Sequence, residues 1–290
     1  MNKGKYVFSQ VMTFFPRWIF EDAVKRYNGD FHAKNLNSYS HCLHLMFGQL
    51  AGCNSLKDIT LVLRSVNKAS YHLGIPTVVD PSSLSKANES RDYRIFEELG
   101  MWLIRKVRPM YEKEKIPDVY LPGWEIFAID STTIPCSIKL AEWALGKYSK
   151  GGVKMHTVLD LRLVEFYDAE KEEIITFLTN NFELGPLVIA NIYHNRWQIE
   201  TFFKWIKGNL TIKALWGYSE NAVKIHLWVA ISTYLLLAWV KAALKSPLTI
   251  TEVSKVVGAS LLTKNDIRDL LAVTAPLTQN QNVNELELNF

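Results

Sequence analysis

Residues 189–210, IANIYHNRWQIETFFKWIKGNL, decide the fold of the second half of the chain. This stretch contains four regularly placed polar residues: Tyr193, Arg196, Glu200 and Lys207. The last three follow Tyr193 by 3, 7 and 14 positions. At about 100° per residue they fall at about 0°, 300°, 340° and 320° around a helix, which is one narrow stripe. The apolar side chains fill the neighbouring arc, from about 180° to 280°, and are Ile192, Ile199, Phe202, Phe203 and Ile206. The pattern predicts a long helix over 185–208 that buries one side and presents the polar stripe along another.

That polar stripe has two explanations. A carboxylate flanked by cations on one helix face can hold a metal ion while the cations bind phosphate groups. An ordinary ion pair between Arg196 and Glu200, four residues apart on an amphipathic helix, gives the same spacing. Spacing alone leaves both explanations open.

Segments upstream of this helix have the composition of β-strands. Residues 124–134 are β-branched and aromatic, residues 154–168 alternate between apolar and polar, and residues 173–181 end at two asparagines. Downstream, residues 219–244 and 248–272 have helical patterns. Strands followed by a long helix predict a mixed α/β second domain.

The first part of the chain is expected to be helical. Residues 38–51 have apolar side chains at helical spacing, and Ser55, followed three residues later by Asp58, marks the start of a second helix. A third helix is expected over 91–108. Two short helices joined by a tight turn fit a helix-turn-helix arrangement, and the polar, basic segment 81–91 suits a phosphate backbone. A helical bundle without a ligand fits the same pattern.

Composition shifts along the chain predict its domains. The stretch 109–123 contains three prolines and suits a linker, so we expect a first domain over 1–118, a second over 119–272 and a flexible tail over 273–290. Residues 1–118 carry 17 Lys and Arg against 12 Asp and Glu, whereas residues 119–290 carry 16 against 17. The basic excess of the first domain indicates a polyanionic partner, and an ordinary solvated surface explains it equally well.

Composition also excludes several classes of protein. With 48% hydrophobic residues among 290, the chain is neither disordered nor fibrous. The three cysteines lack CxxC spacing, which predicts a reducing compartment. The same spacing argues against a disulfide framework and against a cysteine-rich zinc site.

Residues 225–240 are apolar with no formal charge except at His226. The run is shorter than the roughly 20 residues of a membrane span, so a core helix is expected. With no signal peptide recognised at the N-terminus, the prediction is a cytoplasmic protein without a membrane partner.

The letters of the polar stripe resemble a known family. At all four positions Y-x2-R-x3-E-x6-K resembles the signature of the DDE transposases of bacterial insertion sequences, in the branch called insertion-sequence family four. The segment AIDSTTI around Asp130 is similar to that family's first catalytic strand, and HTVLDLR and FLTNN are similar to its later strands. KYVFSQ and SLSKAN, in the first part of the chain, resemble the helical DNA-binding module of one subgroup. The resemblance implies an α+β protein, with an N-terminal helical DNA-binding domain before an RNase H-like α/β catalytic domain.

The resemblance also implies a chemistry. In this family three carboxylates bind two divalent cations, usually Mg²⁺, for in-line displacement at a DNA phosphate. Asp130 and Glu200 match the first and third carboxylates, and are therefore the expected catalytic residues and metal ligands. Tyr193, Arg196 and Lys207 would hold DNA phosphates near the cut. The expected partner is double-stranded DNA, as transposon ends and as target, with a homodimer in the DNA complex.

The second carboxylate has no counterpart by context. Only 69 residues separate Asp130 from Glu200, and none of them forms the D-x-G-[YF]-like turn that carries it in relatives. The patterns on either side of the join near 162–163 belong to strands that are not consecutive in the family, which predicts an incomplete catalytic domain. Asp160 lies within a strand pattern and Asp168 within a charged hairpin.

Two functions follow as alternatives: a transposase that cuts and joins DNA, or a catalytically inactive remnant that still binds it. An unrelated helical binding protein fits less well, because all four stripe positions match.

Overall fold

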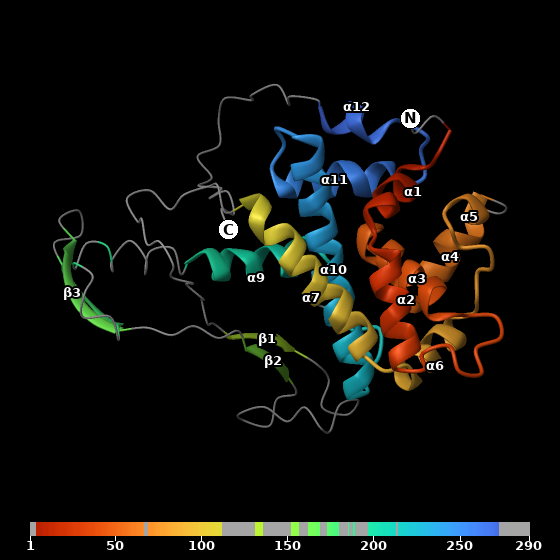
Figure 1. Cartoon of the computed structure of the whole chain (residues 1–290), viewed down its shortest axis with the longest axis horizontal. Coiled ribbons are helices and arrows are strands. Elements are labelled where there is room, and N and C mark those ends of the chain that lie inside the picture. Colours follow the sequence, from red (N-terminus) through yellow and green to blue (C-terminus); the bar gives the residue numbers. More distant parts are fainter. Residues whose placement is uncertain are drawn as a thin grey trace.

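The structure is a computed structural model, and it describes residues 4–66, 69–111, 131–135, 152–156, 162–168, 173–179, 185, 188, 197–212 and 214–272. Before the strands, the helices are α1 (Val7–Val11), the 3-10 turn η1 (Met12–Phe14), α2 (Arg17–Arg26), α3 (Ser38–Leu50), α4 (Leu56–Ser65), α5 (Ala69–His72), α6 (Pro81–Ser90) and α7 (Arg94–Tyr111). After them come α9 (Trp197–Asn209), α10 (Glu220–Leu244), α11 (Ile250–Ser260) and α12 (Ile267–Leu271). Figure 1 shows these helices gathered in one body.

Local signals set the first helices. The Asn37 side chain accepts a hydrogen bond from the Ser40 amide at the start of α3, and Ser55 accepts one from the Asp58 amide at the start of α4. Gly52 between them has a φ of +66°, which favours glycine. The two predicted helices and their turn are therefore confirmed. Residues 81–90, expected only as a polar segment, form α6, with Pro81 at its first turn.

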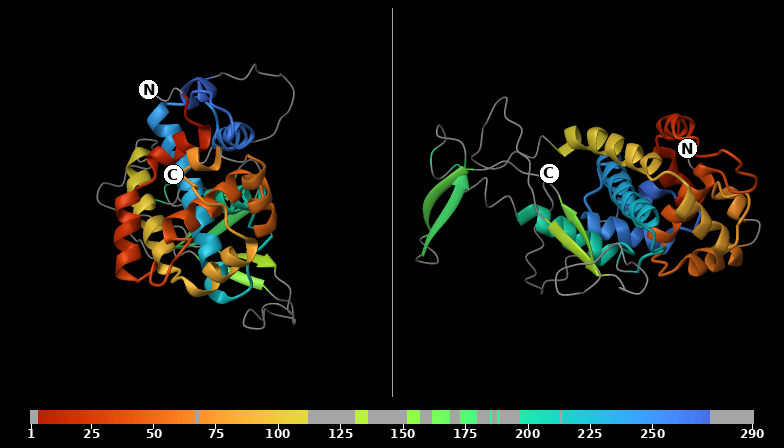
Figure 2. Two further views of the ribbon diagram at one scale, coloured as in Figure 1. Left: turned by 90° about the vertical axis from the view of Figure 1, so that its right-hand side faces the viewer. Right: turned by 90° about the horizontal axis from the view of Figure 1, so that it is seen from below.

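Helices from both ends of the chain share one hydrophobic core. The apolar helix α10 makes its most extensive contact with α7 and also packs against α3, α6 and α11. At the N-terminus, the amide of Val7 donates to the carbonyl of Thr263 at 2.9 Å and the amide of Phe8 to that of Leu261 at 3.2 Å. Figure 2 shows the same mixing from two further sides. Segments on either side of the expected 118/119 boundary are thus packed together, and the boundary itself lies outside the described residues.

The apolar helix α10 is largely interior. Among the described helices it alone is long and apolar enough to cross a membrane by length and composition, yet 56% of its most apolar 18-residue window is buried inside the protein. Val229, Leu237 and Val240 are fully buried against the surrounding helices. This burial agrees with the prediction of a core helix over 225–240.

The last predicted helix is two helices. The sequence predicted one helical stretch over 248–272, whereas α11 ends at Ser260 and α12 begins at Ile267. Each has its own N-terminal cap: Thr249 and Glu252 form a capping box on α11, and Asp266 accepts from the Arg268 amide on α12. A second capping residue starts a new helix, so the helical pattern over 248–272 corresponds to two helices.

The described strands form two antiparallel pairs. β1 (Ser131–Pro135) pairs with β2 (Gly152–His156), with Ser131 opposite His156. β3 (Arg162–Asp168) pairs with β4 (Glu173–Thr179), with Arg162 opposite Thr179. The strand predicted over 173–181 is present as β4, and β1 overlaps the run 124–134 at residues 131–134, the rest of which lies outside the described residues. The run 154–168 overlaps two separate strands, the end of β2 and all of β3. Within the described residues these pairs are two-stranded, so the RNase H-like sheet stays a prediction.

We expect Gly100→Ala to lower the free energy of unfolding by about 1–3 kcal/mol, because overpacking strains a rigid contact. A Cβ at Gly100, where α7 crosses α10, would lie 2.6 Å from the Trp228 ring. The matched control is Gly208→Ala in α9, where a Cβ would meet nothing within 4 Å. Alanine there is expected to raise stability by up to about 1 kcal/mol. Urea unfolding followed by circular dichroism measures both, and equal stability of the two variants would contradict the close α7–α10 contact.

Candidate functional site

Two of the predicted site residues, Glu200 and Lys207, lie in α9 (Trp197–Asn209). Lys207 is half-buried in the last turns of α9, and Glu200 is in the same helix. Asp130, Tyr193 and Arg196 lie outside the described residues, and so does the side chain of Glu200. The described strand β1 begins at Ser131, directly after Asp130. The convergence of Asp130 with Glu200 therefore stays a prediction.

The buried side of α9 agrees with its sequence pattern. Phe203 and Ile206, two residues of the predicted apolar arc, are 4% and 1% exposed. Trp205, which that arc did not include, is also buried; its indole N–H donates to the Thr251 hydroxyl at 2.9 Å, and its ring lies 4.7 Å from that of Tyr234. The buried face of α9 is thus wider than predicted and lies against α10 and α11.

The described residues on the outward side of α9 lie close to the sector that the sequence predicts for the polar stripe. Lys204 and Gly208 are exposed, at about 20° and 60° on the same helical projection, and Lys207 is half-buried at about 320°. The position of Glu200, at about 340°, falls between them. The spacing rule applied to residues 193–207 should also have included Lys204, four residues after Glu200, as a cation of the stripe.

A buried polar network fixes the segment after α9. The amide of Thr211 donates to Gln49 Oε1 at 2.9 Å, and the amide of Trp216 donates to His226 Nδ1 at 3.2 Å. Because Nδ1 accepts, neutral His226 carries its proton on Nε2, which donates to the Thr211 carbonyl at 2.9 Å. Gln49 is in α3 and His226 in α10, so the end of α9 is held by helices from both ends of the chain. Sequence reasoning treated His226 only as an interruption of an apolar run.

Burial changes the chemistry of these groups. It lowers the pKa of His226 to about 4, since charging a fully enclosed imidazole is costly. It also raises the pKa of the Cys42 thiol and raises that of Cys53 to about 11. Both described cysteines are free thiols, held protonated and unreactive at neutral pH.

No metal cluster occurs within the described ranges: they contain no group of three or more His, Cys, Asp or Glu placed to hold an ion. The residues expected to bind Mg²⁺ are Asp130 and Glu200, and their side chains are not among those described. The magnesium site therefore stays a prediction from the resemblance.

Two families match the chain. Residues 161–236 match the family described as "Transposase DDE domain", and residues 3–76 match a domain of unknown function, DUF4372. The first match contains all four stripe positions. Its start at residue 161 lies beside the join near 162–163.

Three curated relatives are transposases by name. The "Probable transposase for insertion sequence element IS5377" of Geobacillus stearothermophilus is 41% identical over 78 residues, 27% of this chain and 20% of the relative. The "Putative transposase y4zB" of Sinorhizobium fredii is 39% identical over 89 residues, 31% of this chain and 24% of the relative. The "Putative transposase for insertion sequence element IS4SA" of a Synechocystis strain is 33% identical over 106 residues, 35% of this chain and 31% of the relative.

The matches with these relatives cover only part of each protein. This chain spans between 20% and 31% of the length of those relatives. No solved structure matches it. The transposase DDE match and the three transposase relatives agree on one group of proteins. Residues 161–236 of the chain are thus similar to the DDE transposases of insertion sequences.

Proposed function

We propose that this protein binds the DNA ends of an insertion sequence, and that its second half is an RNase H-like domain of insertion-sequence family four. The observation that carries the proposal is the stripe of Tyr193, Arg196, Glu200 and Lys207, which lies within the transposase DDE match at 161–236. The outward sector of α9 at Lys204 and Lys207 supports it, because a helix that holds a DNA backbone must present its cations away from the core.

In this proposal each stripe residue has a role. Arg196 and Lys207 bind backbone phosphates through charge-assisted hydrogen bonds, and the Tyr193 hydroxyl adds a neutral one. Asp130 and Glu200 are the carboxylates that would hold divalent cations. Two bound Mg²⁺ ions would supply activation of the attacking oxygen and stabilisation of the leaving oxygen. We further propose a homodimer on the DNA and a cytoplasmic location.

A second candidate function is a DNA-binding remnant without cutting activity. Two observations favour it: the interval between Asp130 and Glu200 lacks the turn that carries the second carboxylate, and the transposase DDE match begins at residue 161, beside the join near 162–163. Both fit the loss of a block that held the second aspartate. DNA binding is common to the two candidates, and cleavage separates them.

We expect the full chain to bind duplex DNA carrying the sequences that flank its reading frame, with an affinity that falls steeply between about 50 mM and 200 mM salt. The double variant Arg196→Gln with Lys207→Gln is expected to reduce the salt slope by about 2, one for each lost phosphate contact. Fluorescence anisotropy measures both. The full chain is required, since residues 7–107 share a core with residues 205–271.

The matched control for this measurement is Lys25→Gln with Lys255→Gln. Both lysines are exposed and lie on α2 and α11, outside the predicted stripe, and the change in net charge is the same. The control is expected to keep the salt slope of the parent. Equal slopes in all three proteins would contradict the role given to Arg196 and Lys207.

A further inference from the structure

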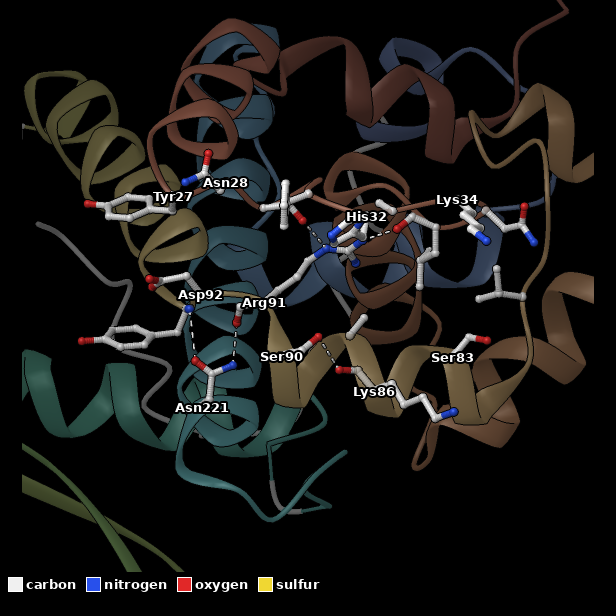
Figure 3. Close-up of a pocket in the computed structure, with 18 of the residues that line it drawn as sticks. Tyr27, Asn28, His32, Lys34, Ser83, Lys86, Ser90, Arg91, Asp92 and Asn221 are labelled. Atoms are coloured by element: carbon white, nitrogen blue, oxygen red, sulfur yellow. Dashed lines mark hydrogen bonds between the residues drawn. The ribbon is translucent and has the colours of Figure 1, made fainter.

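A cavity of about 910 Å³ lies in the N-terminal half of the molecule. Its walls are the loop between α2 and α3, the helix α6, the junction of α6 with α7, and the first turn of α10. Figure 3 shows Lys34, Lys86 and Arg91 reaching it from separate segments. Lys207, the stripe residue whose side chain the structure describes, does not line it.

The lining of this cavity is cationic. It holds the side chains of four basic residues, Lys34, Lys86, Arg91 and Arg94, against one carboxylate, Asp92. Asp92 is already paired, because Arg94 Nη2 lies 2.5 Å from one of its oxygens. Lys34 and Lys86 are exposed and form no ion pair with the part of the chain that the structure describes. A net positive charge therefore faces the cavity.

The most unusual of these cations is Arg91, which is only 8% exposed. Its Nε–H donates to the Gly29 carbonyl at 3.2 Å, and its Nη2 donates to the Leu36 carbonyl. Its third nitrogen, Nη1, is buried without a hydrogen-bond partner. Burial lowers the pKa of this guanidinium. A buried cation with an unsatisfied donor is costly, even with the negative charge of Asp30 acting on Arg91. An anion in contact with Nη1 would satisfy that donor and balance the remaining charge.

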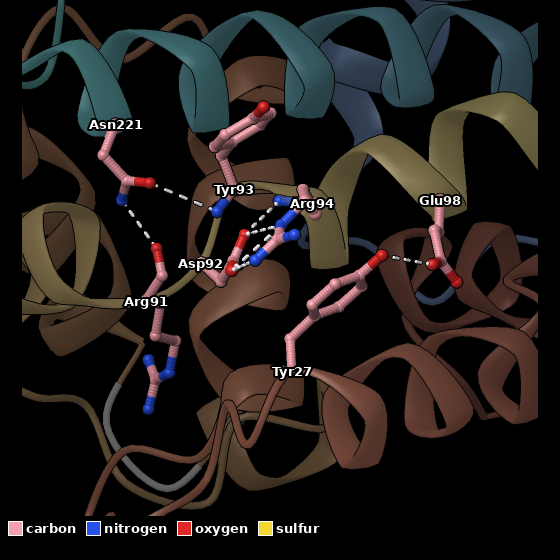
Figure 4. A network of polar contacts seen from close by, with 7 residues as sticks. All are labelled: Tyr27, Arg91, Asp92, Tyr93, Arg94, Glu98 and Asn221. Atoms are coloured by element: carbon pink, nitrogen blue, oxygen red, sulfur yellow. Dashed lines mark hydrogen bonds and ion pairs between the residues drawn. The ribbon is translucent and has the colours of Figure 1, made fainter.

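Fixed contacts hold this cation in place. Asn221, at the start of α10, donates through Nδ2 to the Arg91 carbonyl at 2.6 Å and to the Asn88 carbonyl at 2.8 Å. Its Oδ1 accepts from the Tyr93 amide at 3.2 Å. Figure 4 shows Asn221 joining the two residues on either side of Asp92. The backbone around Arg91 is thus set before any ligand arrives, which lowers the cost of ordering on binding.

We propose that this cavity binds a phosphodiester group of the DNA backbone, with Arg91 as the buried anchor and Lys34 and Lys86 at its mouth. The inference rests on the proposed function for the identity of the polyanion. Guanidinium groups suit phosphate oxygens in geometry and charge. The cavity is far larger than one phosphate group, so it has room for the sugars on either side. Contacts of this kind set the position of a protein on DNA without reading its sequence.

The test compares the full chain with the double variant Lys34→Gln plus Lys86→Gln, using a duplex of mixed sequence. We expect the double variant to bind about tenfold more weakly at 0.1 M salt. We also expect the slope of log affinity against log salt concentration to become shallower by about 2. The control is again Lys25→Gln with Lys255→Gln, exposed lysines outside the cavity. Thermal unfolding of each protein checks that all of them are folded.

The outcomes separate the inference from the proposed function. If the parent shows no salt-sensitive binding, the proposed function fails and the inference fails with it. If the parent binds and the two double variants lose affinity equally, the cavity is not a DNA contact and only the inference is overturned. Inorganic phosphate is titrated in parallel, with the Arg91 Nε–H resonance as the readout. A phosphate-induced shift combined with unchanged DNA affinity in the cavity variant would make the cavity a small-anion site and would also overturn it.

Discussion

Cleavage of DNA by this chain in Mg²⁺ is expected to be at least about 100-fold slower than cleavage by a related transposase that keeps all three carboxylates. Two-metal chemistry needs ligands that hold two cations about 3.5–4 Å apart. In the proposed site, Asp130 and Glu200 would supply two carboxylates, which neutralise less of the charge on the cations than three would. Asp168 is in β3, opposite Glu173 in an antiparallel pair, and its sequence context does not resemble the turn that carries the second aspartate in the family.

The measurement is nicking of supercoiled DNA that carries the flanks of the reading frame, with Mg²⁺ or Mn²⁺. The parent and its Glu200→Ala variant are expected to cut at the same low rate, while both still bind the DNA. Lys255→Gln, an exposed change on α11, controls for the effect of altered charge. Robust cutting by the parent that disappears in Glu200→Ala would show that a complete catalytic site survives and that no block with the second carboxylate has been lost.

Helices with local signals could be predicted from the sequence. The start of α4 follows from Ser55 and Asp58, and the turn before it follows from Gly52. The buried side of α9 follows from the spacing of Phe203 and Ile206. In each case the signal lies within a few residues of the feature that it determines.

Contacts between distant segments could not be predicted in this way. Gly100 and Trp228 lie where α7 packs against α10. No local sequence pattern around either residue predicts this contact. The same holds for Arg91, whose hydrogen bonds go to the carbonyls of Gly29 and Leu36. The segment 81–91 was expected to face phosphate because it is small, polar and basic; its burial of Arg91 depends on a loop some 55 residues earlier in the chain.

The candidate site also combines a local sequence pattern with contacts between distant segments. The polar stripe within 193–207 is a local pattern, so its four residues could be predicted from spacing and from the resemblance. The network of Gln49, Thr211 and His226 joins α3, the end of α9 and α10, and a single sequence offers no signal for it. Its effect on stability is nonetheless large, because His226 is fully enclosed.

We expect the free energy of unfolding to fall by about 3 kcal/mol from His226 alone as the pH drops from neutral to about 4. In the folded protein, burial lowers the pKa of His226 from 6.5 to about 4. The unfolded chain therefore takes up a proton between those values that the folded protein does not, and stability is lost as the pH falls through that window. Above pH 6.5 this contribution is fully present. Burial also lowers the pKa values of His41 and His44, which adds to the loss in the same direction.

Urea unfolding at pH 7 and at acid pH measures this loss, and His226→Gln isolates it. Glutamine cannot take up the proton, so the variant should be less stable at neutral pH but show a shallower decline on acidification. The control is His72→Gln, because His72 is exposed on α5. A protonated His226 would present a donor at Nδ1 to the Trp216 amide, which now donates to it at 3.2 Å. The segment that follows α9 should therefore loosen first, with faster hydrogen exchange at the Trp216 amide before global unfolding. An unchanged pH profile in His226→Gln would mean that other groups cause the acid sensitivity.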